Sequence, residues 1–425
     1  MTLVVVLFVV LLLLEMPLAF SIGIAGLSYF LMSDYLPLTI SVQKIASASQ
    51  SFPLLAVPFF VLAGHMMNRT GISDHLIGFS KTLVSWISGG LAHVSIVLST
   101  LMGGVSGSAV ADACMEARVL GPSMIKSGLS PGYTAGVIAV SSLITSTIPP
   151  SIGLILYGYI GNVSIAKLFI AGIFPGFLMM ALLMFSAWVI AKRRGYQPEA
   201  SRRPTAGEVW RGMKDAKWAL LFPLMLVITI RFGIFTPSEA GAFAVVYSVL
   251  VGFFAYRTLT VKKIISALHE SINDIGMIML IIMLSALVGY AIVFERLPQS
   301  IAETMNGVTS NPDLMLLLIL GFLVLVGMVM EATVSVLLLT PIFVPMIQVL
   351  GIDPVHFGIL MMIVVTLGGM TPPVGVAMYS VCGILKCPTD RYVIESLPFI
   401  LVILLMVAIL ALFPHVVLFL PNLLM

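Results

Sequence analysis

Residues 143–152 read LITSTIPPSI, and residues 366–375 read TLGGMTPPVG. Each stretch carries a Pro-Pro pair next to a run of apolar residues long enough to form a helix. Proline cannot donate a backbone hydrogen bond, and it pushes the preceding residue out of helical geometry. The two stretches therefore predict helices that are interrupted at Pro149 and at Pro372.

The composition of the chain places these interruptions in a lipid bilayer. Hydrophobic residues make up 60% of the 425 residues and charged residues only 9%, whereas about a quarter of the residues in a soluble domain are charged. Because a spanning helix needs about 20 apolar residues, the sequence accommodates roughly ten to twelve membrane segments. The first apolar run, residues 3–32, is predicted to be a retained helix kinked at Pro17. The longest polar segment, residues 192–217, is predicted to be a loop because it is too short to form a core.

The prolines of the two halves fall into register. Pro149 and Pro372 are 223 residues apart, and the same shift pairs every proline between residues 91 and 180 with a proline of the second half, without a gap. The aligned pairs are Pro122 with Pro345, Pro131 with Pro354, Pro149 with Pro372, Pro150 with Pro373 and Pro175 with Pro398. Similarity at a fixed offset indicates an internal repeat. We expect repeat 1 at about residues 1–200 and repeat 2 at about residues 224–425.

The distribution of basic residues predicts the orientation of these repeats. Eight Lys and Arg residues lie between residues 192 and 217, which marks that loop as cytoplasmic under the positive-inside rule. Residues 295–312 are then periplasmic, the N-terminus cytoplasmic and the C-terminus periplasmic. An odd number of crossings, about five, separates Gly128 from its counterpart Gly351. The second repeat is therefore expected to be inverted relative to the first.

Four short polar segments interrupt the apolar helices at corresponding places in the repeats. Residues 103–112 match residues 327–335, and residues 145–151 match residues 366–373. Inverted repeats with interrupted helices are typical of secondary transporters, which bind substrate and coupling ions near the bilayer midplane. Carbonyl groups freed by proline suit a sodium ion, and helix N-termini beside Ser or Thr suit a carboxylate.

The first hairpin is predicted to be re-entrant. Residues 91–103 span about 20 Å as a helix, less than the bilayer core of about 30 Å. The second hairpin begins near residue 314, and the sequence is compatible with either a re-entrant or a fully spanning hairpin there.

Two acidic residues lie in these apolar hairpins. Ionisable groups inside a membrane are costly and are functional by default, so Asp112 and Glu331 are candidate binding residues. The alternative for Asp112 is an ion pair with Arg118. His65 and His93 are predicted to be packed histidines rather than proton relays.

Enzyme motifs are missing from the sequence. It has no Gly-x-x-x-x-Gly-Lys-Ser/Thr phosphate loop, no His-Glu-x-x-His and no Gly-x-Ser-x-Gly elbow. Transport driven by an ion gradient is therefore predicted, with neither catalysis nor a nucleic-acid partner. A proton-coupled or exchange carrier working without partner proteins is one alternative, and a channel or scaffold without coupled transport is another.

Six motifs together carry a resemblance to a known family. They are FPLLAVPFFVLAG at residues 52–64, SGSAVAD at 106–112, IPPS at 148–151, LFIAGIFPG at 168–176, FTPSEAGA at 235–242 and TPPVG at 371–375. With them, essentially the whole chain resembles the DctM-like large permease subunit of tripartite ATP-independent periplasmic (TRAP) transporters, in the ion transporter superfamily. The resemblance implies an all-α integral membrane protein with two inverted-topology repeats, re-entrant hairpins and discontinuous helices, working as an elevator-type transporter.

The resemblance also implies an activity and partners. The chain would be a symporter in the bacterial inner membrane that imports an organic acid, such as a dicarboxylate, a sugar acid or sialic acid, with sodium as the coupling ion and no other cofactor. A small membrane subunit and a periplasmic substrate-binding protein would complete the transporter.

Carried over by position, two sets of site residues follow from the resemblance. The sodium sites would involve Ser106, Ala109, Thr145, Thr147 and Pro149 in repeat 1 and Met330, Thr333, Thr366, Gly369 and Thr371 in repeat 2. The substrate would meet Ser106, Gly107, Ser108, Asp112, Pro150, Ser151, Glu331, Thr333 and Pro373. One departure is CMEAR at residues 114–118, where smaller and less charged residues are expected.

Overall fold

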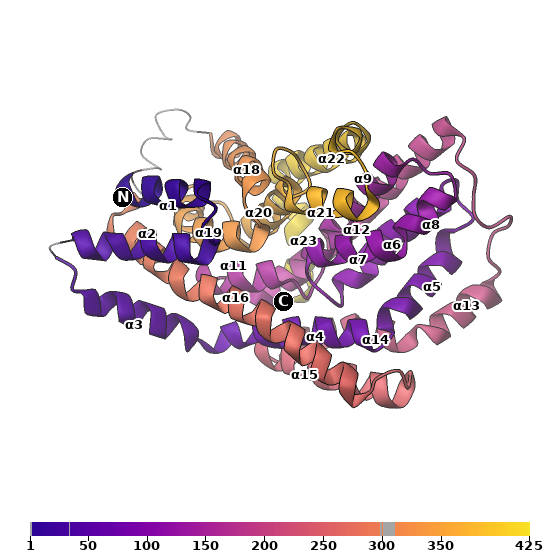
Figure 1. Cartoon of the computed structure of the whole chain (residues 1–425), viewed down its shortest axis with the longest axis horizontal. Helices are drawn as coiled ribbons and strands as arrows, with labels where there is room; N and C mark the ends of the chain where they lie inside the picture. Colours follow the sequence, from indigo (N-terminus) through magenta and orange to yellow (C-terminus); the bar gives the residue numbers. More distant parts are fainter. Residues whose placement is uncertain (1, 34, 298–299, 301–310) are drawn as a thin grey trace.

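The computed structural model describes residues 2–33, 35–297, 300 and 311–425, and every regular element in this part of the chain is a helix. The predicted periplasmic stretch at residues 295–312 lies largely outside the described residues. Figure 1 shows an elongated body, with α1 to α3 at one end and α5, α8 and α13 towards the other.

The helices of the first half are α1 (Thr2–Leu13), α2 (Leu18–Met32), α3 (Leu38–Ser49), the 3-10 turn η1 (Phe52–Leu55), α4 (Ala56–Arg69), α5 (Ile72–Val84), α6 (Gly90–Gly103), α7 (Ala109–Val119), α8 (Gly121–Lys126), α9 (Pro131–Ser141), α10 (Leu143–Thr147), α11 (Ile152–Ile160) and α12 (Ile165–Arg194). Those that follow are α13 (Ala206–Asp215), α14 (Lys217–Arg231), α15 (Pro237–Leu250), the π-turn η2 (Val251–Ala255), α16 (Val261–Phe294), α18 (Pro312–Val329), α19 (Ala332–Val349), α20 (Pro354–Gly368), α21 (Val376–Leu385), α22 (Thr389–Leu412) and α23 (Pro414–Leu424).

Among the described residues, six helices are long and apolar enough to cross a bilayer: α12, α15 with η2, α16, α18, α19 and α22. Two bent pairs bring the total to as many as eight. Leu38–Ser49 meets Phe52–Arg69 at 52°, and Pro131–Thr147 meets Ile152–Ile160 at 45°. The described residues also contain six shorter apolar helices of 10–17 residues. The predicted ten to twelve membrane segments are therefore not all full spans. The prediction of an all-helical membrane protein with interrupted helices is confirmed.

The first apolar run forms two helices rather than one kinked helix. α1 ends at Leu13, Glu15 adopts a positive φ of 59°, and Pro17 caps the start of α2. The two helices pack against each other. The prediction of a kink at Pro17 is wrong, since proline, whose missing N–H costs nothing at a helix start, begins a new helix here.

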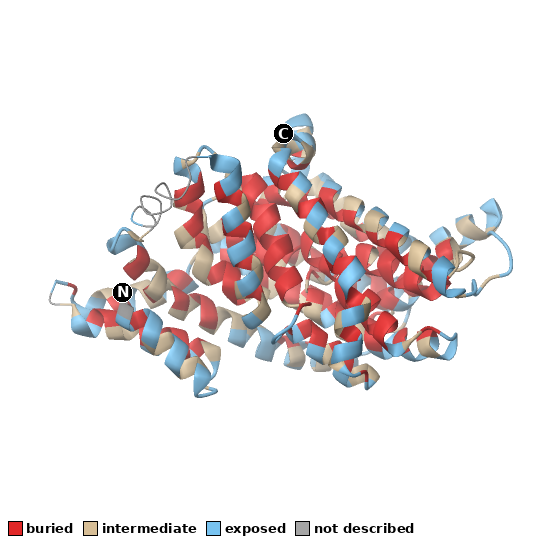
Figure 2. Ribbon diagram, turned by 90° about the horizontal axis from the view of Figure 1, so that it is seen from above, coloured by how far each residue is buried: buried red, intermediate tan, exposed pale blue. Residues whose placement is uncertain are grey.

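The interior is formed by helices buried on all sides, and the exterior by helices with an apolar outer face. Nearly every residue of α6 and α20 is buried, and both adjoin the polar interruptions. The buried segments form the middle of the body in Figure 2. On α22, Leu401, Leu405 and Ile409 lie on one face and are exposed, which suits contact with lipid acyl chains.

The polar segment at residues 192–217 is more ordered than a simple loop. α12 ends at Arg194, followed by its C-cap Gly195 with a φ of +70°, and α13 begins at Ala206, preceded by its N-cap Thr205. Glu208 accepts a hydrogen bond from the Thr205 backbone at 2.8 Å and completes a capping box. The prediction of a loop without a helix is therefore corrected, because a capping box stabilises even a short helix.

Several helix boundaries agree with the 223-residue shift. α9 begins at Pro131 and α20 at Pro354, and both are followed by a Pro-Pro break. The second arms of the hairpins differ, because α7 and α8 are separate helices whereas α19 continues through Pro341 and Pro345. The placement of the polar interruptions is thus more regular than that of the helices between them.

Candidate functional site

A cavity of about 640 Å³ opens where the polar interruptions meet. One wall is formed by the two hairpin tips, residues 106–111 and 331–334, together with residues beside the two helix breaks. The opposite wall is formed by α4 and α16 and includes His65, Asn68 and Asp274. Its volume lies within the range of small-molecule sites, about 300–1,000 Å³.

The first tip is closed by hydrogen bonds within residues 106–112. Ser106 donates its hydroxyl to Asp112 at 2.6 Å and accepts from the backbone of Ser108 at 3.3 Å. Ser108 is the N-cap of α7. Gly107 has a φ of +65°, and a Cβ there would collide with the carbonyl oxygen of Pro150. The tip of the hairpin therefore rests directly on the first helix break.

The first break leaves two carbonyl groups without helical partners. The residues four positions after Thr145 and Ser146 are Pro149 and Pro150, neither of which has an N–H to donate. Elsewhere among the described residues, no hydrogen bond to these two carbonyl oxygens is present. Ser151 then caps α11 by accepting from Leu154. Bare carbonyl oxygens in a buried, partly polar setting are the groups that a hard cation binds.

The second break has the same proline pair but uses its carbonyl groups differently. The carbonyl of Gly368 accepts from the backbone and the hydroxyl of Thr371 at 2.9 and 2.8 Å. The carbonyl of Gly369 accepts from the backbone of Ala377 at 3.0 Å. Both peptide bonds, Pro149-Pro150 and Pro372-Pro373, are cis. In the second half, the chain itself thus satisfies the carbonyls that proline frees.

The second tip is built around a capping carboxylate. Glu331 is half-buried and caps α19, accepting from the backbone of Thr333 at 2.8 Å and from its hydroxyl at 3.0 Å. Behind the tip, a Cβ on Gly368 would collide with the backbone of Gly327, and a Cβ on Gly327 would collide with the carbonyl group of Val365. Only glycine allows two backbones to come this close.

The two breaks meet through a polar contact. Ser146 donates to the hydroxyl of Thr366 at 3.2 Å, and both side chains are buried and line the cavity. Residues 220 positions apart in the sequence therefore share one site.

The structure brings some of the predicted site residues to the cavity and not others. The lining includes Ser106, Gly107, Ser108, Ala109, Glu331, Thr333, Thr366 and Gly369. The other predicted residues lie outside the lining: Asp112, Thr145, Thr147, Pro149, Pro150, Ser151, Met330, Thr371 and Pro373. Some of these residues contact a lining residue without lining the cavity themselves, as Asp112 contacts Ser106. The alternative ion pair between Asp112 and Arg118 is absent, because Asp112 turns to Ser106 instead.

Sequence reasoning missed most of the opposite wall. His65 bonds Asp274 at 2.7 Å and lies 3.6 Å from Glu270, which also pairs with Arg69. His65 was expected only to be packed, and Asp274 was not considered. An acid in the middle of an apolar helix of 34 residues was the signal that could have identified Asp274.

Sequence reasoning also left the role of Glu116 open. This residue is fully buried and accepts hydrogen bonds from Ser95 at 2.5 Å and Ser99 at 2.7 Å. Ser141 lies beside them, 3.1 Å from the Ser99 hydroxyl. Glu116, one of the two charged residues in the departure at 114–118, is therefore an internal brace that joins α6, α7 and α9.

The family of the chain follows from comparison with known proteins. A model of the family described as "Tripartite ATP-independent periplasmic transporter, DctM component" matches residues 5–416. The chain belongs to this family. It is thus a multi-pass membrane protein and a TRAP transporter large permease, not an enzyme, as the sequence predicted.

Several curated relatives of this TRAP permease match over most of its length. The sialic acid TRAP transporter large permease protein SiaM of Vibrio cholerae is 37% identical over 96% of this chain and 95% of its own. The 2,3-diketo-L-gulonate TRAP transporter large permease protein YiaN of Escherichia coli is 33% identical over 95% and 94%. The isethionate TRAP transporter permease protein DctMQ of Oleidesulfovibrio alaskensis is 31% identical, and the match covers 97% of this chain but 65% of that protein.

A solved structure shares the fold. The crystal structure of the YdaH transporter of Alcanivorax borkumensis superposes with a TM-score of 0.66 over 97% of this chain and 98% of its own, at 15% identity. At this identity, the likeness concerns the fold alone.

Gly368→Ala is expected to destabilise the permease, because the added methyl group would collide with the backbone of Gly327. Overpacking of this kind costs about 1–3 kcal/mol or more, so the melting temperature in detergent should fall by several degrees. Gly383→Ala is the matched control, because the added Cβ on this helix would meet open space. It should leave the melting temperature unchanged or higher. Equal melting temperatures for the two variants would contradict the close contact.

Glu116→Ala is expected to lower stability by about 2–4 kcal/mol, because it opens a cavity and leaves two buried serine hydroxyls without their acceptor. Glu116→Gln keeps a carbonyl acceptor in place, so its loss of stability should be markedly smaller than that of the alanine variant. Thermal unfolding of both variants measures the difference. If the alanine variant unfolds at the wild-type temperature, the brace does not contribute to stability.

Proposed function

We propose that this permease imports an organic acid together with sodium ions, after a periplasmic binding protein delivers the acid, and that it works with a small membrane subunit. The observation that carries the proposal is the cavity between the two tips and the two breaks. There, carbonyl oxygens, hydroxyl groups and helix N-termini lie side by side. A cation and an anion can therefore be bound next to each other.

Sodium binding is supported best in the first half. The free carbonyl oxygens of Thr145 and Ser146 lie at the break, and Asp112 and Ser106 close the tip that rests on it. Oxygen ligands with one carboxylate suit a hard cation. We therefore include the carbonyl oxygen of Ser146 among the proposed sodium ligands. The second half offers fewer free oxygen ligands for sodium, since the carbonyl groups of Gly368 and Gly369 already accept hydrogen bonds.

Anion binding is supported best at the start of α7. Its N-terminus faces the cavity beside Ser106 and Ser108, and a helix N-terminus attracts a carboxylate through its N–H groups and dipole. At the start of α19, the carboxylate of Glu331 already occupies the capping position. A substrate acid would meet repulsion there. We place its carboxylate on the side of α7, where the proposed sodium ion would balance the charge of Asp112.

The class of substrate follows from the relatives. Sialic acid, 2,3-diketo-L-gulonate and isethionate, which the names of relatives give as their substrates, are all organic anions. DctMQ is longer than the matched region, as expected if it also contains a small membrane subunit. We propose the same class of substrate for this permease, and a small subunit and a binding protein as its partners.

The proposed mechanism is alternating access of the elevator type in the bacterial inner membrane. Tips and breaks from the two halves are joined by the contact between Ser146 and Thr366, and they face the wall formed by α4 and α16. The two repeats at about residues 1–200 and 224–425 are proposed to be inverted, with the N-terminus cytoplasmic and the C-terminus periplasmic. The first hairpin is proposed to be re-entrant.

Replacing sodium by potassium outside proteoliposomes that contain the permease and its small subunit should abolish uptake of the acid presented by the binding protein. Two further conditions separate the alternatives. A proton-coupled or exchange carrier would retain uptake in potassium and without the binding protein. A channel would never accumulate the acid above its outside concentration.

Asp112→Asn is expected to reduce uptake on the order of tenfold or more, and to raise the sodium concentration for half-maximal uptake, because the tip loses its negative charge while Ser106 keeps a bonding partner. Asp313→Asn, an exposed acid at the start of α18, is the matched control and should transport normally. An unchanged sodium dependence in Asp112→Asn would remove this residue from the site.

A further inference from the structure

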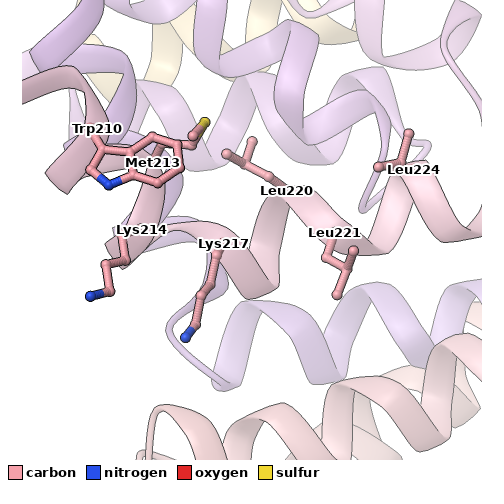
Figure 3. Close-up of a pocket in the computed structure, with 7 residues that line it drawn as sticks. All are labelled: Trp210, Met213, Lys214, Lys217, Leu220, Leu221 and Leu224. Atoms are coloured by element: carbon pink, nitrogen blue, oxygen red, sulfur yellow. The ribbon is translucent and has the colours of Figure 1, made fainter. Parts of the chain in front are cut away.

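An open groove runs along the junction of α13 and α14, away from the transport cavity. It has a volume of about 450 Å³ and is lined by Trp210, Met213, Lys214, Lys217, Leu220, Leu221 and Leu224. Figure 3 shows the leucine side chains along α14 and the two lysine side chains together at the other end of the groove. The groove thus has an apolar end and a cationic end.

The apolar end belongs to the outer surface of the protein. Leu221, Leu224 and Ile228 are 36%, 57% and 42% exposed and follow one another along one face of α14. Exposed aliphatic side chains in such a stripe on a membrane protein face acyl chains. An acyl chain lying in the groove would therefore continue along this stripe into the bilayer.

The cationic end lies where a membrane surface is expected. Trp210 on α13 is 62% exposed, and tryptophan prefers the depth of the lipid headgroups. Lys214 and Lys217 lie on either side of the junction, and in the described part of the chain no carboxylate forms an ion pair with them. The Nζ of Lys217 lies 5.1 Å from the ring centroid of Trp218. Both ammonium groups are therefore available to a phosphate.

We propose that this groove binds an anionic phospholipid, with the phosphate between Lys214 and Lys217 and an acyl chain along Leu220, Leu221 and Leu224. Lysines beside an amphipathic helix attract anionic lipid headgroups at the membrane surface. The segment that carries α13 contains eight basic residues, which adds to this attraction. The lipid would hold α13 at the membrane surface and fix the junction between α13 and the start of α14.

Quenching of Trp210 by brominated lipids tests the site. The chain has four tryptophans, so the triple variant Trp86→Phe, Trp188→Phe and Trp218→Phe leaves Trp210 as its only tryptophan. Excitation at about 295 nm or above avoids tyrosine, and any tryptophan of the small subunit is also replaced. The variant is assembled with the small membrane subunit and reconstituted in phosphatidylcholine vesicles that contain either brominated phosphatidylglycerol or brominated phosphatidylcholine. Half-maximal quenching is expected at about tenfold lower mole fraction of the brominated anionic lipid.

Two lysine pairs give the matched comparison. Lys214→Gln with Lys217→Gln should remove the preference for the anionic lipid. Lys262→Gln with Lys263→Gln removes the same amount of charge at the start of α16. This control pair should retain the preference for the anionic lipid. Equal quenching by the two brominated lipids in the starting variant would overturn the proposal, as would a preference that survives in the first pair. A preference that appears only when the small subunit is left out would show that the groove is a protein interface, and this too would overturn it.

Discussion

The hydrogen-bonding requirement of backbone carbonyl groups inside a bilayer is the constraint on which the rest of this structure depends. With no water to accept or donate, each group freed from a helix needs another partner. The two Pro-Pro pairs free such groups deep in the apolar interior. The neighbouring segments, including the hairpin tips that rest on the breaks, either donate hydrogen bonds to these carbonyl oxygens or leave them free to bind a ligand.

The two halves meet this constraint in different ways. In the second half, Gly368 and Gly369 have carbonyl groups that accept from Thr371 and Ala377, so the chain closes on itself. In the first half, the corresponding groups near Thr145 receive no hydrogen bond from the described residues. One break therefore satisfies its own carbonyl groups, while the other leaves two carbonyl oxygens without a hydrogen bond from the described residues, as the proposed cation site requires.

The sequence predicted the features that local chemistry determines. Proline pairs, small polar tips and apolar runs identified the membrane fold and the interrupted helices. Eight of the predicted site residues line the cavity. The sequence did not predict contacts that depend on which helices become neighbours. Glu116 is held by serines of another helix, and Asp112 turns to Ser106 rather than to Arg118. Prolines also mislead near helix ends, because Pro17 begins a helix where a kink was expected.

The electrostatics of the cavity fit a moving part that faces a fixed one. On the wall of α4 and α16, His65, Arg69, Glu270 and Asp274 bond with one another. Within the described ranges, no ion pair joins this wall to a tip or a break. If the tips move relative to the wall, as proposed, no salt bridge has to be broken, and the desolvation cost of separating buried charges is avoided. A wall whose charged groups contact one another would also attract an organic acid only weakly. Under the proposed mechanism, most of the binding free energy would then come from the tips and travel with them.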